Sequence, residues 1–131
     1  MLLGAVLTGP PSYPDPLTRA GVIHVPAGNF SYLMGSITGE DYIVGNYSVV
    51  APAQANVTFQ VFNQSQFVAF VHHQPTRSVW SVAPVSNARI VFAAPYTDTF
   101  YLVWENPYPA SSGVALNVYA STTYQSNVVI G

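Results

Sequence analysis

The chain has 131 residues, 50% of them hydrophobic, with only three Lys or Arg, five Asp or Glu and no cysteine. The basic residues are three widely spaced arginines, which cannot neutralise a run of nucleic-acid phosphates or bind an anionic membrane surface. Missing cysteine excludes disulfides, thiolate metal sites and cysteine nucleophiles. Soluble domains usually have about a quarter of their residues charged. The composition therefore indicates a coated or assembled extracellular protein rather than a cytoplasmic enzyme.

The first twenty residues differ from the rest of the chain. Residues 1–9 are a short apolar segment, predicted as a strand, and residues 10–20 are predicted as a proline-rich linker, since residues 10–16 contain four prolines. The apolar segment falls short of the roughly 18 apolar residues that cross a bilayer. It also lacks the positive charge that begins a signal peptide. We expect no membrane span.

From residue 21 to 131 the pattern is one of short strands separated by turn residues. Val57, Phe59 and Val61 alternate with polar residues, which indicates a half-buried strand. Thr99–Trp104 is apolar on both faces, which is typical of a central strand. The best helical candidate is 63–70, although its Val and Phe content equally fits a strand. Strands are expected at 22–25, 30–34, 42–50, 56–62, 66–72, 78–82, 87–94, 99–104, 114–120 and 127–130. This spacing predicts an all-β antiparallel sandwich in a single domain.

Several of these segments together resemble one known family. They are 25–30 (VPAGNF), 39–49 (GEDYIVGNYSV), 57–67 (VTFQVFNQSQF), 92–107 (FAAPYTDTFYLVWENP) and 114–118 (VALNV). The likeness is to the GOLD-like β-sandwich family, the Golgi-dynamics type with prokaryotic extracellular members, and covers about residues 25–120. It implies a GOLD-like or jelly-roll-like sandwich. The cysteine pair of eukaryotic members is absent, so the resemblance does not carry over a cargo-receptor role.

Four asparagines stand in Asn-X-Ser/Thr sequons and are candidates for N-glycosylation: Asn29, Asn46, Asn56 and Asn63. Glycans would supply the hydration that the missing charges do not. The alternative interpretation is that these are ordinary polar strand residues.

The histidines do not indicate a metal site. His72 and His73 are neighbours, and neighbouring residues of a strand point to opposite faces. The sequence therefore predicts a histidine pair at a strand end and no metal.

The acidic residues also indicate structural roles. Glu40 and Asp41 form a lone pair in a turn, which is too few oxygens for calcium. Glu105 is expected to pair with Arg77 or Arg89 across a sheet. No nucleophile elbow is present. We therefore expect no catalytic residues, no cofactor and no enzymatic activity.

The leading functional hypothesis concerns the apolar amino-terminal segment. Its residues Leu2, Leu3, Val6 and Leu7 would insert into the sheet of a neighbouring copy, and a linker reaching about 30 Å would allow this exchange. Head-to-tail exchange yields an open homopolymer, a filament or surface layer. A strand folded onto its own sheet and a signal-peptide remnant are the alternatives for this segment.

The alternative function is a carbohydrate- or protein-binding module that uses exposed aromatic side chains. Tyr13, Tyr108, Tyr119 and Tyr124 are the tyrosines expected at the surface, and Trp80 is a further candidate. Both hypotheses predict an extracellular or cell-surface location. The absence of lysine, with abundant Tyr and Asn, is typical of surface proteins of archaea from hot or acidic habitats.

Overall fold

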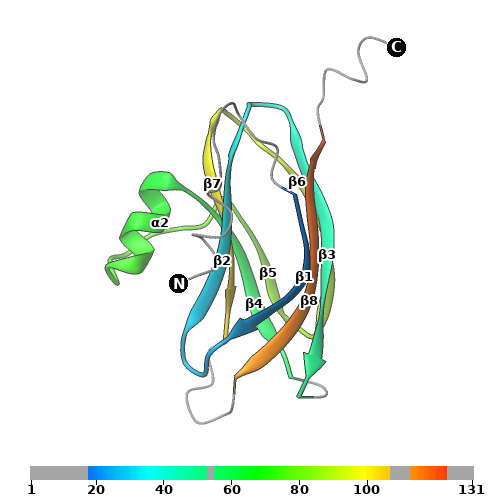
Figure 1. The fold of residues 1–131 in the computed structure, drawn as a ribbon. Coiled ribbons are helices and arrows are strands. Elements are labelled where there is room, and N and C mark those ends of the chain that lie inside the picture. The colour runs from blue at the N-terminus through cyan, green and yellow to red at the C-terminus, as the bar shows by residue number, and fades with distance from the viewer. Residues whose placement is uncertain (1–17, 53–54, 107–112, 124–131) are drawn as a thin grey trace.

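The computed structural model describes residues 18–52, 55–106 and 113–123, which form a sandwich of two four-stranded antiparallel sheets (Figure 1). Sheet A has the order β1 (Thr18–Val25), β8 (Val114–Thr123), β3 (Tyr42–Ala51), β6 (Asn87–Ala93). Sheet B has the order β2 (Phe30–Ile37), β7 (Asp98–Glu105), β4 (Val57–Asn63), β5 (Trp80–Val85). Consecutive strands lie in different sheets, apart from β4 and β5. The predicted antiparallel sandwich is confirmed.

The core fills the space between the two sheets. Tyr47 from sheet A meets Phe59 and Trp104 from sheet B, with ring centroids 5.4 and 5.9 Å away. Phe59 and Trp104 are themselves 5.0 Å apart, and all three side chains are at most 1% exposed. Burying one such ring removes roughly 150–250 Å² from water, a gross gain of about 4–6 kcal/mol. This aromatic contact packs the two sheets against each other.

Several boundaries of the predicted strands change in the structure, among them those of β1 and β2. β1 begins at Thr18, so residues 18–20, which the sequence pattern assigns to the end of the linker, pair with β8. β2 continues to Ile37 because its alternation persists beyond Met34, with Ile37 buried at the inner face.

The segment 66–72, predicted as a strand, instead forms most of a helix, α2 (Gln64–Val71), and the C-cap that follows it. Asn63 caps it: its Oδ1 accepts the backbone N–H of Gln66, and the Gln66 side chain accepts the backbone N–H of Asn63. This reciprocal capping box satisfies two donors that a helix start leaves free. The strand prediction for 66–72 was wrong, and the alternative of a helix at 63–70 is the one that forms.

Helix α2 covers the outer face of sheet B (Figure 1). Phe67 lies flat on Tyr101 of β7, with ring centroids 4.0 Å apart and an interplanar angle of 2°. Phe70 stacks on Phe62 at 4.9 Å. A second apolar cluster therefore lies outside sheet B. This explains why β7 is apolar on both faces and confirms it as a central strand.

Among the described residues, no helix is both long and apolar enough to cross a membrane.

Candidate binding face

The two outer faces of the sandwich differ. Sheet B carries α2, whereas no described element lies over sheet A (Figure 1). We call the outward side of β1, β8, β3 and β6 the open face. On each strand its residues alternate with buried ones: in β8, Asn117 and Tyr119 are exposed between the buried Leu116, Val118 and Ala120.

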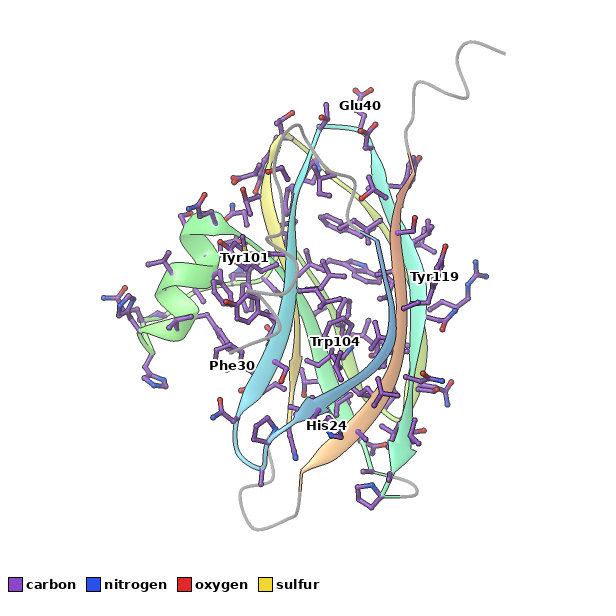
Figure 2. The ribbon with its side chains drawn as sticks, viewed as in Figure 1. His24, Phe30, Glu40, Tyr101, Trp104 and Tyr119 are labelled. Carbon is purple, nitrogen blue, oxygen red and sulfur yellow. The ribbon has the colours of Figure 1, made fainter. Side chains whose placement is uncertain are left out.

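Tyr119 lies on an inner strand of the open face. Its register partners are Ala20 of β1 on one side and Asn46 of β3 on the other, and Asn46 in turn pairs with Arg89 of β6. Tyr119 is 46% exposed although it lies on an inner strand, and its ring points away from the sandwich (Figure 2). An exposed tyrosine, an amide and a guanidinium thus form one continuous row across the sheet.

The neighbouring row is polar on one side of Tyr119, and on the other side it is mainly apolar with one serine. Asn117, Ser48 and Asn87 follow one another in register across β8, β3 and β6. Ser121, Val44 and Val91 form the row on the opposite side, and Val91 is 49% exposed. Aromatic and apolar contacts lie next to hydrogen-bonding groups, as in many protein interfaces.

The open face is almost without charge. Arg89 is the one charged residue at the outward register positions of the described parts of these four strands, and its side chain is exposed. His24 of β1 is exposed near one end of the sheet (Figure 2). Arg89 is therefore the one position on the described open face where a charged side chain could meet an anionic group.

The sequon asparagines fall into two classes. Asn29, Asn46 and Asn56 are exposed, and Asn46 lies on the open face. Asn63 is half-buried at the start of α2, where its Nδ2 donates to the hydroxyl of Tyr96 at 2.8 Å. Glycosylation of these positions stays a prediction.

The histidine pair follows a helix, and the predicted strand end is corrected accordingly. His72 is the C-cap of α2, its Nδ1 lies 2.8 Å from the carbonyl oxygen of Val68, and His73 has a φ of 59°. His24 is on β1, in the other half of the sandwich. Within the described ranges no group of three His, Cys, Asp or Glu residues could hold a metal ion.

The acidic residues that the sequence analysis singled out lie in different environments. Glu40 is exposed in the turn between β2 and β3 (Figure 2), with a φ of 76°. The neighbouring Asp41 is buried. Glu105 is half-buried at the end of β7, and burial raises the pKa of its carboxyl above the usual range.

The expected pairing of Glu105 with an arginine is wrong. Its carboxylate accepts a long hydrogen bond of 3.5 Å from the Gln60 amide. Arg89 lies in the other sheet, and Arg77 is exposed in the segment before β5. The fold therefore does not pair Glu105 with either arginine. The sequence alone does not show which strands are neighbours, so it could not exclude this pairing.

Other predicted site residues are distributed as follows. Leu2, Leu3, Val6 and Leu7, and also Tyr13, Tyr108 and Tyr124, lie outside the described residues. Trp80 is half-buried and packs edge-on against Phe59, so it is not a surface platform. Of the aromatic candidates, Tyr119 is the one that the structure places at the surface.

Sequence reasoning missed Asn117, Ser48 and Arg89 as parts of one surface. The available signal was alternation, which predicts that Asn117 and Tyr119 share a side of their strand. It carries no information on which strand lies next to which.

The fold is similar to that of PliG from Aeromonas hydrophila, described as a periplasmic inhibitor of g-type lysozyme, with a TM-score of 0.52 and 11% identity. The alignment covers 84% of this chain and 88% of that chain. No known protein family matches the sequence, and no curated protein matches it either. At this identity the likeness shows the fold alone, a β-sandwich.

Proposed function

We propose that the protein is a non-enzymatic binding module whose open face docks a partner protein. The observation that carries this proposal is the row formed by Tyr119, Asn46 and Arg89 on the uncovered side of sheet A. Tyrosine and arginine are the residue types that most often dominate binding energy at protein interfaces. The name of the structural neighbour PliG, a protein that inhibits another protein, supports the same class of role.

The partner that fits is a folded protein with a mainly uncharged surface and a carboxylate placed opposite Arg89. Charge complementarity favours this occupant, because Arg89 is the sole charge at outward positions of the described sheet A strands. Four strands about 4.8 Å apart and seven residues long span roughly 450 Å², a footprint at the small end of interface sizes. We therefore expect a modest affinity, dominated by Tyr119 and Arg89.

A protein fits this face better than a sugar chain. Tyr119 is the one large aromatic side chain among the exposed residues of the described sheet A. One ring offers a single stacking position, whereas an extended glycan usually needs several. Carbohydrate binding is therefore an outcome that the experiment must distinguish.

The test passes envelope and secreted proteins of the source organism over the immobilised full chain. Matched variants are Tyr119→Ser and Arg89→Glu on the open face, and Val68→Ser on α2, where Val68 is similarly exposed at 48%. A protein retained by the wild type and by Val68→Ser, and bound at least about tenfold more weakly by both open-face variants, supports the proposal. Equal retention by all four chains contradicts it, as does release by soluble glycans. Purified g-type lysozyme serves as a first defined probe.

We retain assembly by strand addition as a second proposal. What supports it is that both described sheets end in edge strands, β1 and β6 in sheet A and β2 and β5 in sheet B. Edge strands present unpaired N–H and C=O groups that accept another strand. Removing residues 1–9, which carry Leu2, Leu3, Val6 and Leu7, should abolish filaments seen by negative-stain microscopy. Filaments of unchanged length from the truncated chain would refute this second proposal.

Both proposals place the protein outside the cell or at its surface. The sequons and the scarcity of charge support this location, as does the periplasmic description of PliG. Membership in the GOLD-like family belongs to the same proposal, supported by the sandwich fold and by the resemblance of residues 92–107.

A further inference from the structure

The sequons differ in how their amide groups are used. At Asn63, Oδ1 accepts hydrogen bonds from the Gln66 backbone N–H and from the Ser65 hydroxyl, and Nδ2 donates to the Tyr96 hydroxyl. A sugar on this nitrogen would compete with Tyr96 and crowd the start of α2. Asn63 is therefore better explained as a helix cap than as a glycosylation site.

The side chain of Asn46, in contrast, is exposed. It lies in the middle of β3, and strand alternation turns both Asn46 and the sequon hydroxyl of Ser48 to the open face, where both are exposed. Tyr47, between them, points inward and is 1% exposed. Among the residues that the structure describes, no side-chain hydrogen bond engages the Asn46 amide or the Ser48 hydroxyl, and both side chains are exposed.

A group attached to Asn46 would lie over the row that we propose as the binding surface. Asn46 stands directly between Tyr119 and Arg89 in the register of the sheet. Side chains opposite one another in antiparallel strands have Cβ atoms about 5 Å apart, roughly the width of one sugar ring. The first sugar on Asn46 would therefore reach the ring of Tyr119, and the following sugars would cover the rows beside it.

We infer that Asn46 is an N-glycosylation site and that its glycan closes the open face to the partner. In the transfer, Asn46 Nδ2 loses a proton and bonds to C1 of a sugar supplied by a polyprenyl-(di)phosphate oligosaccharide. The bond from C1 to the phosphate oxygen breaks, and the phosphate-bearing lipid leaves. The glycosylation of Asn46 is independent of the proposed function. The claim that the glycan blocks partner binding rests on the proposed function, because it assumes that the open face binds a partner.

The experiment uses protein purified from its native source together with three variants expressed there. Asn46→Gln and Ser48→Ala each remove the sequon at the open face, and Asn29→Gln removes a different exposed sequon as the control. Peptide mass spectrometry identifies the glycan, and nitration by tetranitromethane reports how accessible each tyrosine is. Tyr96, 42% exposed and away from this face, is the internal reference for Tyr119.

The expected result is a glycopeptide containing Asn46 in the wild type and in Asn29→Gln. Nitration of Tyr119, relative to Tyr96, should then rise several-fold in both Asn46→Gln and Ser48→Ala. An unmodified Asn46 peptide, or unchanged nitration of Tyr119 in these two variants, would overturn the inference. Partner binding is measured separately on protein made in a host without N-glycosylation. Failure of that protein to bind a partner would contradict the proposed function, whereas the glycopeptide and nitration results test this inference.

Discussion

The rings of Tyr47 and Trp104 meet edge to face in the core, with centroids 5.9 Å apart and an interplanar angle of 81°. Within the described part of the chain, the buried side-chain polar atoms without a hydrogen-bond partner are the Tyr47 hydroxyl and Trp104 Nε1. The contact that joins the two sheets therefore also contains two buried polar atoms without a hydrogen-bond partner. A buried hydroxyl without a partner costs roughly 1–3 kcal/mol.

Replacing Tyr47 with phenylalanine should stabilise the protein. The variant keeps the ring and its contacts with Phe59 and Trp104 while removing the unsatisfied hydroxyl, so we expect the free energy of unfolding to rise by about 1 kcal/mol. Urea unfolding followed by tryptophan fluorescence measures the change. The control is Tyr96→Phe, which removes a hydroxyl bonded to Asn63 and should lower stability slightly. A destabilised Tyr47→Phe would show that the hydroxyl has a partner.

Tyr47 should also make the fold sensitive to alkali. Burial raises the pKa of its hydroxyl from 10.0 to about 12, so the folded chain holds this proton more tightly than the unfolded chain. The stability contributed by the neutral side chain is complete below pH 10 and is lost as the pH rises through about 12, a loss of about 3 kcal/mol. Over this pH interval the wild type should lose more stability than Tyr47→Phe, as measured by urea unfolding. Parallel curves for the two proteins would refute the assignment.

Gly45 should not tolerate a side chain. A Cβ at this position would lie 1.9 Å from the carbonyl oxygen of Tyr119 and 2.9 Å from the Cα of Ala120, both backbone atoms of the neighbouring strand β8. Gly45→Ala must therefore push β3 and β8 apart beneath the open face, at a cost of about 3 kcal/mol. Thermal unfolding followed by circular dichroism tests this. Gly39→Ala, whose nearest backbone contact would be 3.2 Å, should lower the melting temperature less.

Asn63 is both the cap of α2 and part of a sequon, and two substitutions separate these roles. Asn63→Ala removes the acceptor for the Gln66 backbone N–H and should cost about 1 kcal/mol. Asn63→Asp also destroys the sequon but keeps the acceptor oxygen, so it should lie much closer to the wild type in urea unfolding. Equal destabilisation by the two variants would mean that the cap is not what Asn63 contributes.

The sequence predicts the sandwich well because apolar and polar residues alternate along most of its strands. Val57, Phe59 and Val61 of β4 show the period of two that a half-buried strand requires, and the structure buries all three. The sequence left helix and strand open at 63–70, because Phe67 and Phe70 are residue types that also favour a strand. The signal that could have found the helix is the spacing of Asn63 and Gln66, which is that of a capping box.

The candidate site could be predicted only in part. Alternation in β8 places Asn117 and Tyr119 on the side opposite to Leu116 and Val118, so the exposure of Tyr119 follows from its neighbours. That Tyr119 meets Asn46 depends on the pairing of β8 with β3, which are far apart in the chain. Such pairing results from closing the whole sandwich, and no short pattern encodes it.

The most direct test of the open face as the binding surface is site-specific photo-crosslinking on the full, unglycosylated chain. A benzophenone side chain replaces Tyr119 in one preparation and Val68 of α2 in another, and each is irradiated with the source organism's envelope and secreted proteins. We predict a discrete crosslinked protein from position 119 and none from position 68. The same crosslinked protein from both positions, or crosslinking from position 68 alone, would contradict the account.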